Sequence, residues 1–496
     1  MTGYTQSFYW EKIKNTPSEK TSILKNFDKN KYQLFSLNLD NFKILLADVP
    51  SRKNIGSSPM VVINFPDKKG NMERFQVSET STLAPEIAIK YPNIKTYIGF
   101  SLDNPGARIR FSVTPQGLKT MSTYPNKPAL FTVPLNKGDK SLYITYDRSM
   151  RIDSKKDFEC LTENENVPIK EIISLNRDAN DQILRTLRIA ISTTGEYTNF
   201  WDDGDDTNGD AQEDALAALV STLNRTNEVF EVDMAITFQL VTGTEIIYPT
   251  SSTDPYTGSF NSQLQSTLTS EVGESNYDIG HLFNYGGNNG NAGCIGCVCV
   301  DGQKGSGFSS HSFTDNDGGP NMDDFFDIDY VPHEIGHQMG GNHTFSQSNE
   351  GTGVNYEPGS GTTIMGYAGI TGANDVQDHS DPYFHYGTIN QVLNNLDTRT
   401  CWTSTEITNN PPVADAGDDY TIPQGTAFKL VGSATDSDEE DVLTYTWEQV
   451  DSGTTTSSNF GPAKTSGAVW RSRPPSTSPT RYMPARSRVL SGELTE

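Results

Sequence analysis

The sequence predicts a multidomain protein: a β-rich N-terminal domain, a central α/β domain and a partial antiparallel β-sandwich. Three observations support this order. Short strand-like segments bounded by proline and glycine fill the first part of the chain. A strand–helix–strand succession follows them, as expected for an α/β layer. Beyond a proline-containing linker, apolar and polar residues alternate across turns. The length of 496 residues suits about three domains.

The N-terminal domain is expected over residues 1–180, with helical interruptions between its strands. Its strand-like segments include PMVVINFPD (59–67), ARIRFSVTP (107–115) and SLYITYDR (141–148). The polar stretch at 163–182 is expected to connect this domain to the next one. Exposed polar connectors are where proteases cut, and Lys170, Arg177 and Arg185 are candidate cleavage positions.

The central α/β domain is expected over residues 184–405. The segment 186–192 reads as a strand, and 211–233 has helical apolar spacing with an acidic start that suits the helix dipole. Strands are expected next at 234–241 and 277–287. The segment 296–309 reads as a sheet edge with turns, and 386–397 as a last helix.

The C-terminal domain is expected over residues 409–496, after the linker TNNPPVADAGDD (408–419). Its alternating pattern is typical of an antiparallel sandwich. The tail ends without a closing feature, so we expect a truncated sandwich.

Charge and hydropathy exclude several classes of function. The formal net charge of −25 argues against electrostatic binding to nucleic acid or to an anionic membrane. No run reaches the roughly 18 apolar residues that span a bilayer. The first residues lack the pattern of a secretory signal, so the protein is either cytosolic or its signal is not in this sequence. The acidity favours solubility outside the cell.

The stretch VPHEIGHQMGGNHTF (331–345) holds three of the seven histidines of the chain. His333 and His337 stand four residues apart, which places both on one face of a helix. Gly340 and Gly341 can end that helix and let the chain return His343 to the same point. Three histidine ligands leave the fourth position of a zinc ion open for water.

Glu334 lies between the first two histidines and is the candidate general base. It could take a proton from a zinc-activated water and later give it to a leaving amine. The alternatives are a chance cluster and a structural zinc site. A structural site would usually add a fourth protein ligand, often cysteine.

The motif from His333 to His343 resembles the extended zinc signature of the metzincin metalloproteases. Met365, 22 residues beyond His343, resembles the methionine turn that lies beneath the metal in that family. The closest resemblance is to the reprolysin group, especially its secreted bacterial members, over roughly residues 184–402. Residues 30–160 resemble the matching propeptide more weakly, and the C-terminal part resembles polycystic-kidney-type immunoglobulin-like repeats.

Two positions near the motif depart from the reprolysin pattern. Thr344 stands where reprolysins usually place aspartate. Tyr367 follows Met365 by two residues, as a tyrosine does in astacins and serralysins, where it can approach the metal and stabilise the oxyanion. The alternative for Tyr367 is a packed aromatic side chain.

The five cysteines are an odd number, which leaves a spare thiol. The reprolysin resemblance implies a disulfide between Cys299 and Cys401. Cys294 and Cys297 could pair locally, bind a metal or remain free thiols. Cys160 is a candidate cysteine switch, because a thiolate on the zinc would fill the water position. The alternative is a buried free cysteine.

Two acidic clusters, at 202–210 and 435–442, offer carboxylates that could hold calcium. Neither matches the EF-hand loop, and solvated turns are the alternative interpretation.

Together these observations predict a secreted or cell-surface, monomeric zinc endopeptidase that its propeptide keeps latent and that cleaves protein or peptide substrates. The rival hypothesis is an inactive protease-like adhesion or binding protein. It is disfavoured because Glu334 and all three histidines are present.

Overall fold

The computed structural model describes residues 9–14, 24, 32–53, 60–148, 158–163, 179–313 and 323–496. Most of the expected connector, including the candidate cleavage positions Lys170 and Arg177, lies outside these residues. Arg185 is buried in a strand, which makes it a poor target for a protease. Within the described ranges, no helix is both long and apolar enough to cross a membrane.

The N-terminal region forms one antiparallel sheet, which has nine strands among the described residues, in the order β1-β2-β9-β8-β7-β6-β5-β4-β3. The strands are β1 (Trp10–Lys12), β2 (Gln33–Leu37), β3 (Val61–Pro66), β4 (Met72–Glu79), β5 (Lys95–Ser101), β6 (Arg108–Thr114), β7 (Gly117–Tyr124), β8 (Lys127–Pro134) and β9 (Leu142–Asp147). The helices α1 (Leu39–Leu46) and α2 (Pro85–Lys90) interrupt them. The strands expected at 59–67, 107–115 and 141–148 are confirmed as β3, β6 and β9.

An aromatic core fills one side of this sheet. Phe42 of α1 packs edge-on against Phe65 of β3 and Phe111 of β6, with ring centroids 5.9 and 6.2 Å apart. Large aromatic side chains bury much apolar area each, so a few of them can hold a helix against a broad sheet.

The central sheet has seven strands among the described residues, in the order β10-β14-β15-β13-β11-β12, with β16 also on β11. They are β10 (Glu159–Cys160), β11 (Ile183–Thr193), β12 (Ile236–Leu240), β13 (Ile279–Tyr285), β14 (Asn289–Asn291), β15 (Gly307–His311) and β16 (Thr403–Glu406). Strands β11, β12, β13 and β15 are parallel, whereas β14 is antiparallel to β15. The outer strand β10 comes from the N-terminal side of the chain and pairs parallel with β14.

Helices surround this sheet, and one of them, α7, holds two of the candidate metal ligands. They are α3 (Gly195–Trp201), α4 (Ala211–Met234), α5 (Phe260–Thr267), α6 (Asp323–Phe325), α7 (Val331–Met339) and α8 (Tyr386–Leu396). Two π-helical turns (Leu268–Val272 and Phe326–Tyr330) and two 3₁₀ turns (Glu274–Asn276 and Gly372–Asn374) complete the set. The helices expected at 211–233 and 386–397 are confirmed as α4 and α8.

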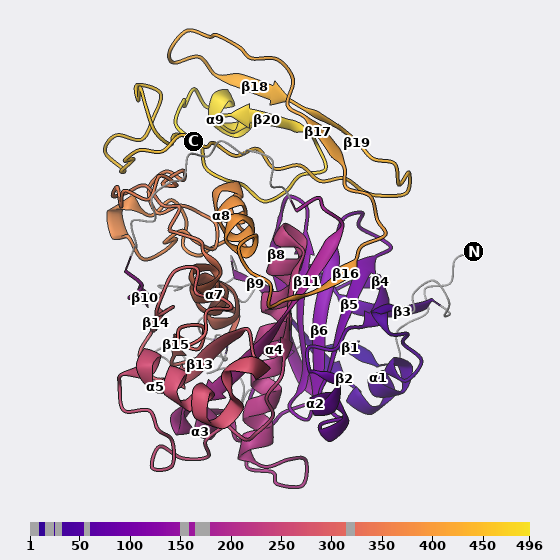
Figure 1. The fold of residues 1–496 in the computed structure, drawn as a ribbon. Coiled ribbons are helices and arrows are strands. Elements are labelled where there is room, and N and C mark those ends of the chain that lie inside the picture. The colour runs from indigo at the N-terminus through magenta and orange to yellow at the C-terminus, as the bar shows by residue number, and fades with distance from the viewer. Residues whose placement is uncertain are drawn as a thin grey trace, which may run out of the picture.

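Helix α4 lies between the two sheets (Figure 1). It begins with a capping box, in which Asp210 accepts from backbone N–H groups of the first turn and Glu213 accepts from the Asp210 N–H. Toward its end, Glu228 and Glu231 meet Arg110 of β6, at 2.9 and 2.7 Å. Although burial acts to raise the pKa of Glu231, Arg110 and Arg52 lower it to about 2.

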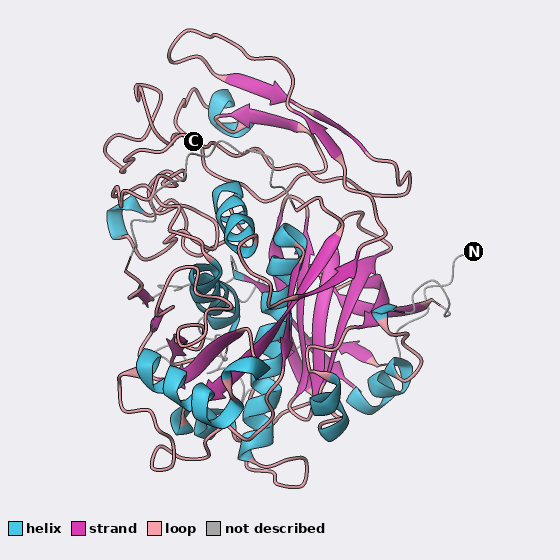
Figure 2. Ribbon diagram, in the orientation of Figure 1, coloured by secondary structure: helices cyan, strands magenta, loops and turns pink. Residues whose placement is uncertain are grey.

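The C-terminal part consists mostly of loops with two short antiparallel ribbons (Figure 2). Strand β17 (Val413–Asp415) pairs with β19 (Ser433–Thr435), and β18 (Phe428–Val431) pairs with β20 (Thr480–Met483). A short helix, α9 (Arg486–Leu490), follows. The packing of such ribbons into an immunoglobulin-like sandwich stays a prediction.

The ion pairs between Arg110 and helix α4 should contribute strongly to stability. Arg110 is 1% exposed, so Arg110→Met would leave two buried carboxylates without this partner. The expected loss is about 3–5 kcal/mol in the free energy of unfolding, measured by urea denaturation of the intact chain. Arg74→Met is the control, because Arg74 and Asp103 form an exposed pair in the same sheet. It should leave the urea midpoint nearly unchanged, and equal losses in both variants would contradict this account.

Candidate active site

Helix α7 positions two of the three candidate metal ligands. Pro332 stands in its first turn, where the missing N–H costs no hydrogen bond. Gly340, with a φ of +120°, ends the helix in a conformation that favours glycine. His333 and His337 project from one face, and the turn after Gly340 returns His343 to that face. All three imidazoles are buried, with at most 1% exposure.

Each of the three histidines has an oxygen partner at Nδ1. His333 Nδ1 lies 2.7 Å from Ile364 O, and His337 Nδ1 lies 2.7 Å from Gly341 O. His343 Nδ1 lies 3.2 Å from a carboxylate oxygen of Glu350. Because carbonyl and carboxylate oxygens can only accept, we assign the imidazole hydrogen to Nδ1 in all three. Every Nε2 then carries a lone pair.

The Nε2 atoms converge on one point. His337 Nε2 and His343 Nε2 lie only 3.0 Å apart, and with both hydrogens on Nδ1 a bound cation would relieve the repulsion of the two lone pairs. The sulfur of Cys160 lies 3.6 Å from His337 Nε2. One ligand atom from each of Cys160 and the three histidines lies within 4.8 Å of the others. Imidazole nitrogen and thiolate sulfur are ligands that zinc prefers, so this group fits a zinc ion.

Burial shapes the protonation of this site. Desolvation and the two neighbouring imidazoles lower the pKa of His337 well below its usual value, so the ring stays neutral and able to bind a metal. Burial likewise raises the pKa of the Cys160 thiol, with the charge of Glu334 acting in the same direction.

Glu334 lies fully buried beside the histidines. Burial raises its pKa to about 8, while a hydrogen bond from Thr162 Oγ1 to Glu334 Oε2, 2.9 Å long, opposes that shift. Strand β14 passes close by at Gly290, where a Cβ atom would lie 2.4 Å from Glu334 Oε1. A glycine is therefore required opposite this carboxylate.

Two other predicted residues also lie at the site. Met365 is buried under α7, and a Cβ on Gly336 would lie 2.6 Å from its sulfur. The half-buried Tyr367 faces the histidines, with its ring centroid 4.5 Å from that of His343 and 5.9 Å from that of His333. Burial raises the pKa of Tyr367, so its hydroxyl keeps the proton.

The segment around Cys160 covers the site as an added strand. Glu159 N donates to Asn288 O at 2.9 Å, and Leu161 N donates to Gly290 O at 2.8 Å. Phe158 is buried, with its ring centroid 5.6 Å from that of His333. Thr162 accepts from Ala292 N and donates to Glu334. The N-terminal side of the chain thus occupies the edge of the central sheet beside the metal ligands.

Sequence reasoning missed two carboxylates that organise the site. Glu350 accepts from His343, and the fully buried Glu357 joins the third histidine to the methionine loop. Glu357 accepts from Thr344 Oγ1 at 2.6 Å and from the backbone N–H groups of Thr362 and Thr363 at 2.7 and 3.1 Å. Thr344 replaces the aspartate of the reprolysin pattern, and a threonine there needs an acceptor. The threonine at position 344 was therefore the one feature of the sequence that could have pointed to an acceptor such as Glu357.

Two disulfides flank the site. Cys299 pairs with Cys401, as the reprolysin resemblance implied, and Cys294 pairs with Cys297, which decides among the open alternatives. Backbone N–H groups of Gly296 and Val298 donate to His337 O and Gln338 O at the end of α7. The local disulfide therefore braces the helix that carries the histidines.

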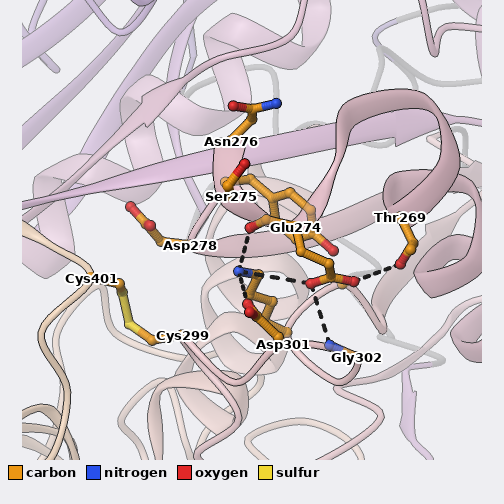
Figure 3. A network of polar contacts seen from close by, with 12 residues as sticks. Thr269, Glu274, Ser275, Asn276, Asp278, Cys299, Asp301, Gly302 and Cys401 are labelled. Atoms are coloured by element: carbon orange, nitrogen blue, oxygen red, sulfur yellow. Dashed lines mark hydrogen bonds and ion pairs between the residues drawn. A yellow bond between two sulfur atoms is a disulfide. The ribbon is translucent and has the colours of Figure 1, made fainter.

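Beside the Cys299–Cys401 disulfide lies a polar network (Figure 3). Glu274 accepts from Thr269 Oγ1 at 2.6 Å and from Gly302 N at 3.3 Å. Lys304 Nζ donates to Glu274 O at 2.6 Å and to Asp301 Oδ1 at 2.5 Å. These bonds hold the chain between Cys299 and β15.

The central domain thus combines a mostly parallel sheet with two histidines on one helix and a third on the turn after it. Residues 183–396 match the model of metallopeptidase family M12B, reprolysin-like, and so form a reprolysin-like metallopeptidase domain. No curated protein matches the chain significantly. Among solved structures, the chain is similar to the crystal structure of metalloproteinase-II from Bacteroides fragilis. The identity is 10% and the TM-score 0.40, over 73% of this chain and 96% of that one.

Glu350 should tune metal affinity through His343. Glu350→Ala removes the acceptor of the His343 Nδ1 hydrogen, so the ring loses orientation and basicity. Loss of such a partner typically weakens a metal site about 10–100-fold, which competition with a zinc chelator would measure. Glu271→Ala, at an exposed acid remote from the histidines, is the charge-matched control. Equal zinc affinity in the two variants would remove Glu350 from the site.

Proposed function

We propose that this chain is a zinc-dependent endopeptidase of the metzincin type, with His333, His337 and His343 as the metal ligands. The convergence of three Nε2 lone pairs beside the buried Glu334 carries this proposal. The match of residues 183–396 to a metallopeptidase family supports peptide bonds as the substrate. Met365 supplies the apolar floor beneath the ligands.

The proposed reaction is hydrolysis without a covalent enzyme intermediate. A zinc ion bound by the histidines would lower the pKa of a water molecule to about 7 and polarise the scissile carbonyl. Glu334 takes the proton of the attacking water and later gives it to the leaving amine. Tyr367 stabilises the oxyanion with its protonated hydroxyl. The substrate backbone would pair with the edge of β14, at the carbonyl oxygens that Glu159 and Leu161 use in the intact chain.

We further propose that the N-terminal region is a propeptide and that Cys160 keeps the enzyme latent. This proposal is supported by the sulfur of Cys160, which lies 3.6 Å from His337 Nε2 and could take the position that water needs on a bound metal, and by the pairing of β10 with β14. Thr162 also holds the Glu334 carboxylate through a hydrogen bond. Activation then requires cleavage between the N-terminal region and β11, after which β10 can leave.

The proposed location is outside the cell, with the C-terminal part as an accessory domain. The two disulfides support an oxidising compartment, because such bonds are rare in the cytosol. Peptide mapping of protein made in such a compartment should find both pairs, and free thiols at all four positions would oppose this proposal.

Substitution of Glu334 separates the general base from the metal ligands. Glu334→Ala should keep stoichiometric zinc but lose about 10²–10⁴-fold in cleavage of a denatured protein by the activated enzyme. Loss of zinc in His337→Ala is the complementary result. Near-normal cleavage by Glu334→Ala would contradict the mechanism. It would show that Glu334 neither acts as the general base nor positions the attacking water. In the same assay, an unchanged kcat in Tyr367→Phe would show that the Tyr367 hydroxyl does not stabilise the oxyanion and that the ring only packs.

Substitution of Cys160 tests latency in the uncleaved chain. Cys160→Ala should give partial peptidase activity, since water could reach the metal while β10 still covers the sheet edge. Leu161→Ala is the matched control, because this side chain is 40% exposed and only its backbone pairs with β14. The control should stay as inactive as the wild type. An inactive Cys160→Ala chain whose cleaved form is active would show that the N-terminal region inhibits by coverage alone.

A further inference from the structure

Arg148 is a buried cation that reaches from the N-terminal region into the metallopeptidase domain. It directly follows strand β9, and its side chain is only 5% exposed. The side chain ends between α6 and the π-helical turn that leads into α7. It forms ion pairs there with Asp324 and Asp329, at 3.0 and 2.7 Å. Neither the proposed metal site nor the proposed reaction uses this contact.

Every nitrogen of the Arg148 guanidinium has a partner from the metallopeptidase domain. Nε donates to Asp324 Oδ2 at 3.0 Å, and Nη2 donates to Asp324 O at 2.5 Å. Nη1 donates to Ser380 O at 3.0 Å and lies 2.7 Å from Asp329 Oδ2. The guanidinium carbon lies 5.0 Å from the centre of the Phe325 ring. This arrangement suits the planar fork of arginine, whereas the single ammonium of a lysine could not reach all four oxygens.

The acceptors are fixed by contacts from both parts of the chain. Asp324 and Asp329 are 0% exposed. Ser380 N donates to Asp329 Oδ1 at 2.8 Å, and Tyr146 of β9 donates its hydroxyl hydrogen to Asp324 Oδ1 at 2.9 Å. Although burial acts to lower the pKa of Arg148, the charges of Asp329 and Asp324 raise it. The guanidinium therefore stays charged, as two buried carboxylates require.

The pocket around the guanidinium lies at the boundary with the N-terminal sheet. A small cavity remains beside the guanidinium. One wall of this cavity consists of Pro128, Ala129 and Phe131 of β8, and the other wall includes Ile328 and Ser380. If the N-terminal region leaves, the first wall and the bound cation leave with it. Two carboxylates, two carbonyl oxygens and an aromatic ring, spaced for a guanidinium, then face the solvent without their cation.

We propose that the metallopeptidase domain carries a binding site for the arginine side chain of a polypeptide. The site consists of two carboxylates, two carbonyl oxygens and one ring, from Asp324, Phe325, Asp329 and Ser380. Arg148 occupies the site in the intact chain. Its use in the activated enzyme rests on the proposed function. There, an arginine of a protein substrate or of the released N-terminal region takes the place of Arg148.

The first test empties the site in the intact chain and refills it with a small guanidinium. Arg148→Ala removes the atoms that N-ethylguanidinium contains. This compound should raise the melting temperature of Arg148→Ala by about 3 °C when its concentration is about ten times its dissociation constant. Ethylammonium has the same charge without the planar fork and should raise the melting temperature much less. If Arg148→Ala does not fold alone, N-ethylguanidinium in the refolding buffer should restore a soluble chain with the zinc content of the wild type.

Two variants show where N-ethylguanidinium binds. Addition of Asp329→Asn to Arg148→Ala should abolish the stabilisation, because the partner of Nη1 loses its charge. Arg74→Ala should not be stabilised, since the pair of Arg74 with Asp103 is exposed and its removal leaves no enclosed pocket. The proposal is overturned if N-ethylguanidinium neither stabilises nor refolds Arg148→Ala more than it does Arg74→Ala. It is equally overturned if Asp329→Asn leaves the effect intact.

The second test uses agmatine, a soluble guanidinium compound, to identify the source of the arginine in the activated enzyme. If protein substrates supply it, agmatine should raise the KM for a denatured protein without lowering kcat. If the released N-terminal region supplies it, agmatine should instead raise the activity. Asp329→Asn enzyme should respond in neither way. A lack of any effect on the wild type would overturn the use of the site after activation. Absence of all cleavage would contradict the proposed function alone, because the melting-temperature test needs no activity.

Discussion

The candidate site depends on one constraint: each of the three imidazoles donates its Nδ1 hydrogen to an oxygen acceptor. Once Ile364 O, Gly341 O and Glu350 hold those hydrogens, the three Nε2 lone pairs must face one another in a dry pocket. That arrangement is unfavourable without a cation and favourable with one. The acceptors come from the methionine loop, the end of α7 and the loop beyond His343. The residues around α7 therefore also orient the imidazole rings that would bind the metal.

The same arrangement supports the proposal that the N-terminal region would inhibit the enzyme by direct contact with the site. Strand β10 adds to the exposed edge of β14 and brings Cys160 to the histidines and Thr162 to Glu334. In the proposed latent state, this segment would therefore occupy three features that the proposed reaction needs: the open metal position, the general base and the substrate edge. The buried pairs of Arg110 with Glu228 and Glu231 hold the N-terminal sheet against α4 meanwhile.

Periodicity and motif spacing predicted α4, α7, α8 and β11, because each is long or carries residues whose chemistry depends on spacing. The motif also predicted that the three histidines lie close together, as the structure shows; their role as metal ligands stays a proposal. Glu350 and Glu357 escaped prediction, since a carboxylate that accepts from a loop has no fixed offset. The pairing of β10 with β14 escaped because it involves few residues and joins distant parts of the chain.

The central claim is that Cys160 and the three histidines hold one zinc ion in the intact chain. Zinc-edge X-ray absorption of the uncleaved protein tests it most directly, and the same measurement after removal of the N-terminal region provides the comparison. The account predicts one sulfur at about 2.3 Å and three nitrogens at about 2.0–2.1 Å in the intact chain. After removal, oxygen should replace the sulfur. A shell of only nitrogen and oxygen in the intact chain would contradict the claim.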